Sequence, residues 1–209
     1  MGYIGKPMPQ YDSFLKVTGT ASYAFDVELP GMLHAKLVTS PHAHAKIVKL
    51  DTSKAEKMPG VVAVATGGEF PYRLGIYVGD RDVLAIDKVR WVGHPVAAVI
   101  AESLEAAERG IDQVEVEYEP LPTVFDPFEA LKPGAPIVHE KMSEYRVSTA
   151  FKPIPGTNIA NQFKLVRGDV DRGLRESDVV VEGEFDIPHV SHAFMETQSI
   201  VAHYKKDGT

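Results

Sequence analysis

The 209-residue sequence contains no cysteine. Without a thiol, the chain cannot form a disulfide, use a cysteine nucleophile, or hold an iron–sulfur cluster or a zinc ion through cysteine. Long apolar runs are missing as well. The longer runs that do occur, such as residues 61–65 and 95–101, are far shorter than the ~20 residues of a membrane-spanning helix.

Positive charge is also scarce. The chain has 22 Lys and Arg residues against 29 Asp and Glu residues, a formal net charge of −7, and no basic stripe. We therefore expect no nucleic-acid partner, because nucleic-acid binding depends on clustered basic side chains. The chain opens with no basic segment followed by an apolar stretch, so we expect no secretory signal and a cytoplasmic protein.

The motifs of several common enzyme classes are missing too. The sequence has neither a glycine-rich phosphate-binding motif nor the Gly-x-Ser-x-Gly turn that presents a catalytic serine. The residues by themselves therefore indicate no self-contained active site.

Short strand-like patterns fill the first half of the chain. Stretches rich in Val, Ile, Leu and Ala predict strands at residues 32–39, 45–51, 61–66, 83–86, 89–92 and 95–101. Val and Tyr alternate with Glu over residues 114–119, which predicts a further, half-exposed strand.

Two helices are expected among these strands. Ser103 is a suitable N-cap for a helix in which Leu104, Ala107 and Ile111 recur at intervals of three and four. Ser53 and Glu56 have capping-box spacing, which predicts a second, short helix. Helices interleaved with short strand pairs predict an α+β fold.

The second half of the chain differs in composition and in its pattern of apolar residues. Residues 120–159 hold nine prolines and glycines, which favours a connecting segment. Residues 160–166, 179–185 and 199–204 then predict three more strands. The chain stops at Thr209, directly after an Asp207-Gly208 hairpin signal without its second strand, so we expect this sequence to be part of a longer protein.

Two histidine pairs have spacings that invite a metal-site interpretation. His42 and His44 are two residues apart, so on a strand they would face the same side, and His189 and His192 are three residues apart. No third ligand is suggested near either pair, and zinc sites need three or four. We interpret both pairs as structural, with a metal site as the alternative.

Two other patterns also favour a structural interpretation. Glu115, Glu117 and Glu119 alternate with apolar residues, which indicates one solvated strand face and no split pair of catalytic carboxylates. The cell-adhesion tripeptide at residues 167–169 is interpreted as a turn.

Several stretches in a fixed order resemble the large subunit of molybdenum hydroxylases, the family of xanthine dehydrogenase, aldehyde oxidase and carbon monoxide dehydrogenase. They are residues 16–21 (KVTGTA), 30–35 (PGMLHA), 40–47 (SPHAHAKI), 58–61 (MPGV), 89–97 (VRWVGHPVA) and 118–122 (YEPLP). Residues 168–169, 179–185 and 192–196 resemble the start of the family's next domain.

The resemblance implies four regions. They are an N-terminal arm at 1–11, an α/β hammerhead domain at 12–125, a Pro/Gly-rich linker at 126–158, and the incomplete, strand-rich start of a molybdopterin-binding domain at 159–209. The family's catalytic glutamate and its cofactor-binding loops belong to motifs beyond Thr209. We accordingly assign no catalytic, cofactor-binding or metal-binding residue to this chain.

Three positions depart from the family pattern. Val190 stands six residues before Glu196, where some members have a glutamine that contacts the cofactor. Gln10 replaces an arginine in the pattern that Pro9 and Asp12 otherwise fit. His94 replaces the more usual acidic residue in a stretch that is not catalytic.

The resemblance implies that the complete protein oxidises an aldehyde, a purine, an aromatic heterocycle or carbon monoxide, with water as the oxygen source. A molybdenum–molybdopterin cofactor would belong to the complete large subunit, with 2Fe-2S clusters and FAD on partner subunits or domains. The expected partners of this chain are therefore the rest of the large subunit, an iron–sulfur small subunit and an FAD medium subunit. We also consider a homo-oligomer. The alternative hypothesis is a stand-alone, non-catalytic hammerhead module for binding or assembly.

Overall fold

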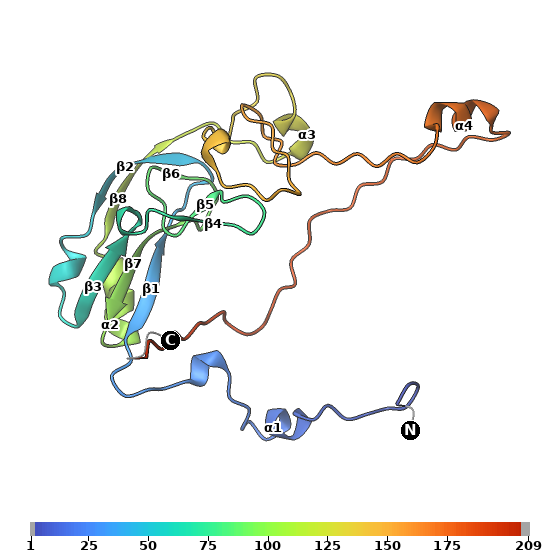
Figure 1. The fold of residues 1–209 in the computed structure, drawn as a ribbon. Coiled ribbons are helices and arrows are strands. Elements are labelled where there is room, and N and C mark those ends of the chain that lie inside the picture. Colours follow the sequence, from blue (N-terminus) through green and yellow to red (C-terminus); the bar gives the residue numbers. More distant parts are fainter. Residues whose placement is uncertain (1–2, 206–209) are drawn as a thin grey trace. The chain divides into compact units, whose positions relative to one another are not determined.

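The computed structural model describes residues 3–205, drawn as a ribbon in Figure 1. The chain divides into two units. One unit is Leu33–Ser177, and the other combines the two terminal segments, Met1–Met32 and Asp178–Thr209. The expected α+β fold is confirmed, because the first of these units combines short antiparallel strands with a few short helices.

The first sheet has three strands in the order β1 (His34–Thr39), β7 (Pro95–Ala101) and β3 (Val61–Thr66), all antiparallel. Helix α2 (Leu104–Ile111) packs against this sheet, and the Ser103 hydroxyl accepts a hydrogen bond from the Ala106 amide at 3.1 Å, as its N-cap position predicts. Ala101, Ala106 and Ala107 form the buried contact between sheet and helix.

The second sheet has the order β6 (Lys88–Val89), β2 (Ala45–Asp51) and β8 (Glu115–Pro120), again antiparallel. Its core consists of fully buried Ala45, Val89 and Val96 together with Ala85. A two-stranded ribbon, β4 (Arg73–Leu74) and β5 (Arg81–Asp82), completes the strands.

The helix expected after Ser53 forms only as a short 3-10 turn, without the expected capping box. The structure has a single 3-10 turn there, η2 (Ala55–Lys57). The Ser53 hydroxyl donates to Asp51 at 2.7 Å, and Glu56 accepts from Thr52, so neither side chain caps the helix. Local side-chain pairing therefore replaces the expected cap. A second 3-10 turn, η3 (Gly67–Glu69), follows β3.

Residues 126–160 form irregular structure with two short helical turns, α3 (Pro127–Ala130) and η4 (Met142–Glu144). They are fixed to residues 75–79 by backbone contacts, including a β-bridge between Val78 and Val147. The Gly79 amide also donates to the Arg146 carbonyl at 2.8 Å. This connecting segment is therefore part of the packed unit.

The described residues from 159 to 205 contain one helix, α4 (Val170–Glu176), and none of the three strands that the sequence predicts. A strand persists only when a neighbouring strand pairs its backbone groups, and no other described strand pairs with these segments. Their apolar side chains are exposed, Phe185 at 90% and Ile187 at 88%. The predicted Asp207-Gly208 turn lies outside the described residues.

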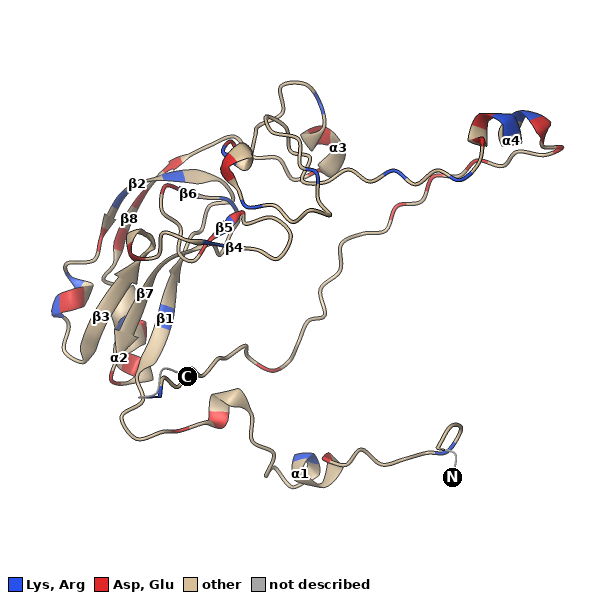
Figure 2. Cartoon of the chain, viewed as in Figure 1, with Lys and Arg blue, Asp and Glu red and all other residues tan. Residues whose placement is uncertain are grey.

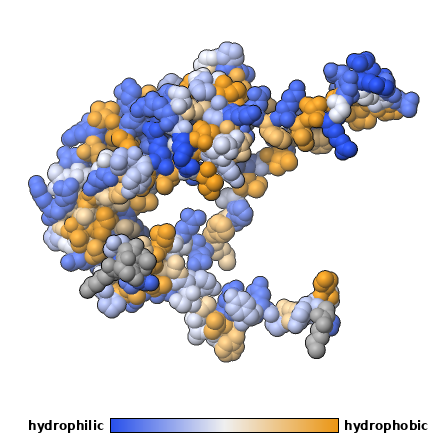
Figure 3. All heavy atoms as spheres, in the orientation of Figure 1, coloured by the Kyte–Doolittle hydropathy of each residue, from blue (hydrophilic) through white to orange (hydrophobic). Residues whose placement is uncertain are grey.

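The N-terminal segment has two short turns, α1 (Ser13–Val17) and η1 (Ala24–Asp26), with no buried residue in either. Apolar residues therefore show at the surface along the terminal segments (orange in Figure 3). Among residues 3–205, no helix combines the length and the apolar character needed to cross a bilayer.

Candidate functional site

The glutamates of β8 lie opposite lysines of β2 and of the turn that follows it, where basic and acidic residues lie side by side in Figure 2. The Nζ–Oε1 distance is 3.1 Å for Lys46 and Glu119 and 3.9 Å for Lys49 and Glu117, and Lys54 pairs with Glu115. All three glutamates are exposed, which confirms the interpretation as a solvated strand face. Exposed pairs of this kind contribute about 0–1 kcal/mol each.

His44 connects two chain segments. Its side chain is 7% exposed, and its Nδ1 lies 2.8 Å from the Pro122 carbonyl oxygen. Because a carbonyl can only accept, Nδ1 carries the proton and donates. The Leu121 amide also donates to the His44 carbonyl at 2.9 Å, so His44 fixes the chain that leaves β8. The His42 ring instead packs edge-on against Tyr118, with centroids 5.1 Å apart.

The second histidine pair lies in the irregular C-terminal segment, and both residues are exposed. The His192 ring stacks on Phe194 at 5.5 Å. Within residues 3–205, no group of three His, Asp or Glu side chains is arranged to hold a metal ion. The tripeptide at 167–169 bends at Gly168, where the interpretation expected a turn, and Asp169 caps α4 by accepting from the Arg172 amide at 2.9 Å.

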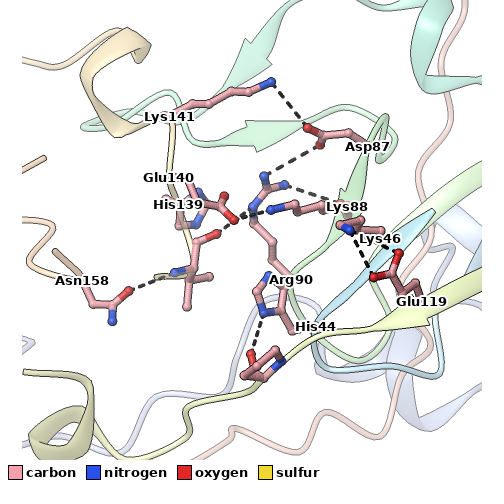
Figure 4. Close-up of polar contacts among 12 residues, drawn as sticks. His44, Lys46, Asp87, Lys88, Arg90, Glu119, His139, Glu140, Lys141 and Asn158 are labelled. Carbon is pink, nitrogen blue, oxygen red and sulfur yellow. Dashed lines mark hydrogen bonds and ion pairs between the residues drawn. The ribbon is translucent and has the colours of Figure 1, made fainter. Parts of the chain in front are cut away.

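A buried arginine joins the hammerhead loops to residues 126–160 (Figure 4). The Arg90 side chain is 6% exposed, and its Nε donates to the Val138 carbonyl at 3.1 Å. The Val138 amide donates to the Asn158 Oδ1 at 3.0 Å. Asn158 in turn donates to the carbonyls of Ala130 and Pro136, at 3.2 and 2.9 Å. Arg90 and Asn158 therefore hold Val138 through its carbonyl and its amide.

Acidic residues surround the Arg90 guanidinium. Its Nη1 lies 4.0 Å from Asp82 and its Nη2 lies 3.8 Å from Asp87. Asp82, 8% exposed, also accepts from the Arg73 Nε at 3.1 Å, and Asp87 lies 3.5 Å from the Lys141 ammonium. A buried arginine with several acceptors meets the requirement that buried charges be paired.

The same end of the unit carries a further ion pair, between Lys88 and Glu140. Burial alone would raise the pKa of Glu140, but the hydrogen bond from Lys88 and the charges of Lys88 and Arg90 hold this pKa below its ordinary value. The Lys88–Glu140 and Asp87–Lys141 pairs both connect the region of β6 to residues 140–141.

His94 is the most buried titratable group here, at 1% exposure. Its Nδ1 accepts from the Arg90 amide at 3.1 Å, and its ring stacks on Trp91 with centroids 3.5 Å apart. Burial, reinforced by the Arg90 charge, lowers the pKa of His94 to about 4. The imidazole is therefore neutral at neutral pH and serves as a structural acceptor, while its buried Nε2 has no partner among the described residues.

His139 and Tyr145 form a second polar pair. The His139 Nδ1 lies 3.1 Å from the Tyr145 hydroxyl, and the Arg73 guanidinium sits 4.7 Å above the Tyr145 ring. Burial and the Arg90 charge lower the pKa of His139, whereas burial raises the pKa of Tyr145. Both groups are therefore uncharged at neutral pH.

A cavity of about 270 Å³ opens beside this pair. Its wall is mostly apolar, with a few polar groups, among them Asp80, His139 and Tyr145. Sequence reasoning identified neither the cavity nor the cluster around Arg90. The partners of Arg90 and Asn158 lie up to 48 residues away along the chain. The one sequence signal was that Arg90 lies within the family-like stretch 89–97.

The residues that resemble a cofactor-binding domain offer no enclosed site by themselves. Every described residue from Ala160 to Lys205 is exposed. The polar groups there that the structure describes are therefore solvated and do not converge on a molybdopterin. Nor does the Arg90 cluster join a nucleophile to a base, so its chemistry is that of a rigid support.

Comparison with known families gives two matches. Residues 18–122 match the aldehyde oxidase and xanthine dehydrogenase α/β hammerhead domain. Residues 151–209 match the molybdopterin cofactor-binding domain. Both matches agree with the resemblance seen in the sequence.

Individual proteins give the same result. A probable xanthine dehydrogenase subunit of Bacillus subtilis (strain 168) is 40% identical over 195 residues, which cover 92% of this chain and 24% of that protein. The nicotinate dehydrogenase large molybdopterin subunit of Eubacterium barkeri is 34% identical over 98% of this chain and 45% of its own length. The chain thus spans less than half the length of these curated relatives.

Among solved structures, a Cu,Mo-CO dehydrogenase matches with a TM-score of 0.59 and 41% identity, over 63% of this chain and 17% of that one. The hammerhead match covers half of the sequence, and the molybdopterin-domain match follows it in order. The chain therefore belongs to the aldehyde oxidase and xanthine dehydrogenase family of molybdenum hydroxylases, whose α/β hammerhead domain it carries.

Proposed function

We propose that this chain is the N-terminal portion of the large subunit of a molybdenum-dependent hydroxylase. The complete protein would oxidise an aldehyde, a purine, an aromatic heterocycle or carbon monoxide, with water as the oxygen source. The observation that carries the proposal is the order of the two family matches, hammerhead first and cofactor-binding domain second, on one chain.

Its task in that assembly is architectural. The hydrogen bond from Arg90 and the ion pair of Lys88 fix residues 126–160 against the hammerhead, and the molybdopterin-domain match begins inside this region, at residue 151. A rigid connection supports the proposal, because cofactor enzymes use the protein to position the cofactor, whose own chemistry performs the reaction.

The division into an arm at 1–11, a hammerhead domain at 12–125, a linker at 126–158 and a cofactor-domain portion at 159–209 is part of the proposal. So is the expectation that 2Fe-2S clusters and FAD reside on other subunits or domains. The lack of cysteine supports the placement of the 2Fe-2S clusters outside this chain, because the common 2Fe-2S clusters are held by cysteine thiolates. The cytoplasmic location stays a prediction.

The test is reconstitution. The chain is co-expressed with the rest of the large subunit and the candidate small and medium subunits, and the purified complex is assayed for molybdenum by elemental analysis. We expect stoichiometric molybdenum in the complex and none in the chain purified alone. No complex and no metal would overturn the proposal in favour of the stand-alone binding module.

A matched pair of variants sharpens this test. Arg90→Met removes the hydrogen bond to Val138, whereas Arg109→Met changes an arginine of α2 whose side chain is 60% exposed. We expect less complex with the first variant and an unchanged yield with the second. Equal yields would show that the fixed connection is not needed for assembly.

A further inference from the structure

The cavity beside Tyr145 is lined mostly by apolar side chains, which suit the aliphatic part of a long side chain. Eight of its lining residues are apolar, among them Val124, Phe125 and Met142. Its volume of about 270 Å³ is near the lower end of small-ligand sites, which usually start at about 300 Å³. The space is therefore suited to one long side chain or a ligand of similar size.

One carboxylate in the wall is without a partner. Asp80 is half-buried and lines the cavity, yet among residues 3–205 no side chain or backbone N–H forms an ion pair or hydrogen bond with its carboxylate. Asp126, the other carboxylate of the wall, is engaged, because its Oδ1 accepts from the amides of Phe128 and Glu129 at 2.7 and 2.9 Å.

Five cations of this unit are already committed, and the exposed Arg81, which follows Asp80 in the chain, forms no ion pair with it among the described residues. Arg73 is bound to Asp82, Lys88 to Glu140, and Arg90 to the Val138 carbonyl with Asp82 and Asp87 beside it. Lys141 pairs with Asp87, and the Arg146 guanidinium donates to the Gly75 carbonyl at 2.6 Å. The Asp80 carboxylate is accessible at the cavity wall and uncommitted among residues 3–205, so it is available to a guanidinium from outside this unit.

The remaining polar groups of the wall do not compete for that role. The lowered pKa of His139 keeps the imidazole neutral at neutral pH. Asn158 uses its amide to hold three backbone groups. Phe125 adds an aromatic ring at the wall, and arginine is the cation that best combines a carboxylate partner with an aromatic surface.

We propose that this cavity receives an arginine side chain from the polypeptide that completes the large subunit, with its guanidinium on Asp80 and its stem against Val124, Phe125 and Met142. This inference rests on the proposed function for the identity of the partner. The chemistry that defines the site is a guanidinium on an apolar stem.

The first experiment uses the full chain alone, labelled with 13C at the methionine methyl groups. Met142 lines the cavity, whereas Met8 and Met195 are 61% and 102% exposed and serve as internal references. The probe is N-acetyl-arginine amide, and its control is N-acetyl-citrulline amide, which has the same shape without the charge. We expect the arginine probe to shift the Met142 signal in a saturable manner and the citrulline probe to leave it unchanged.

Two substitutions locate the charge. Asp80→Asn should weaken binding of the arginine probe about tenfold or more, because a charge-assisted hydrogen bond is lost. Asp112→Asn changes an exposed carboxylate at the end of α2, outside the cavity wall, and should leave binding unchanged. Thermal unfolding of both variants checks that the fold is intact. An unshifted Met142 signal, or equal shifts with both probes or with Asp80→Asn, would overturn the inference.

The second experiment identifies the source of the arginine. In the reconstituted complex, the Met142 signal should already be displaced and should no longer respond to the probe. A complex that forms while Met142 still responds would leave the proposed function standing and refute the arginine site. If the arginine probe binds the chain alone but no complex forms with the other subunits, the chemistry assigned to the cavity is supported and the proposed source of the arginine is refuted.

Discussion

The Arg90 guanidinium donates a hydrogen bond of 3.1 Å to the carbonyl of Val138, which is 48 residues further along the chain. This contact joins the strand-rich hammerhead to an irregular segment that has only short helical turns of its own. Irregular backbone needs such partners, because its polar groups are not satisfied within a helix or sheet. The stability of residues 126–160 should therefore depend on side chains far away in the sequence.

Removing the Arg90 guanidinium tests this dependence. Arg90→Met should lower the free energy of unfolding by about 2–4 kcal/mol, because it leaves the Val138 carbonyl and part of the Asp82 and Asp87 charge without a buried partner. Urea denaturation measures the change. Arg109→Met, on the exposed face of α2, should stay within about 0.5 kcal/mol of the wild type. Similar losses for both variants would contradict the role assigned to Arg90.

Asn158 makes three hydrogen bonds to backbone groups that have no strand or helix partner. Asn158→Ala should cost about 1–3 kcal/mol and should speed proteolytic cleavage within residues 126–160, because buried backbone groups lose their partner. Asn161→Ala is the control, since Asn161 is exposed and accepts one hydrogen bond, from the Lys152 amide at 2.9 Å. Cleavage at the wild-type rate in Asn158→Ala would refute the prediction.

The buried His94 makes the stability depend on pH. Its pKa is about 4 in the folded chain and about 6.5 in an unfolded one, so the unfolded state binds the proton more readily. The stabilisation is complete above about pH 6.5 and declines as the pH falls toward 4, by about 3 kcal/mol in all. Urea denaturation near pH 7.5 and near pH 4.5 should show this loss.

His94→Gln is the control for that pH dependence, because glutamine can still accept from the Arg90 amide but does not titrate. We expect a smaller loss of stability on acidification in this variant. The lowered pKa of His139 acts in the same direction and accounts for part of the slope that remains. An unchanged slope in His94→Gln would show that His94 does not cause the effect.

Gly110 permits the close packing of α2 on the first sheet. A β-carbon at this position would lie 2.7 Å from the Val99 Cγ1 and 3.2 Å from the Val61 Cγ2. Gly110→Ala should therefore destabilise the chain by about 1–3 kcal/mol, although alanine is the better helix former. Gly173→Ala, inside α4 where nothing lies within 4 Å, should be neutral or slightly stabilising. Thermal unfolding distinguishes the two outcomes, and a stabilised Gly110→Ala would contradict the packing argument.

The hammerhead was largely predictable because its signals are local. Alternation over residues 114–119 indicated β8, and the spacing of Leu104, Ala107 and Ile111 after Ser103 indicated α2. The strands predicted at 32–39, 45–51, 61–66 and 95–101 each have a partner within the described chain, whereas residues 83–86 form no strand and only Val89 of the stretch 89–92 lies in one. Residues 160–166, 179–185 and 199–204 carry similar local signals but have no such partner there, so propensity alone did not produce strands.

The sequence by itself determined the α+β class, the family, and the exclusion of every cysteine-based chemistry. These properties follow from composition, local periodicity and motif order, which need no knowledge of contacts. Only the tertiary structure decided that Arg90 binds Val138, that His94 is buried and neutral, and that Asp80 lines a cavity without a partner among residues 3–205. The physical reason is that burial and hydrogen bonding depend on residues brought together over tens of positions, and no local pattern encodes those distances.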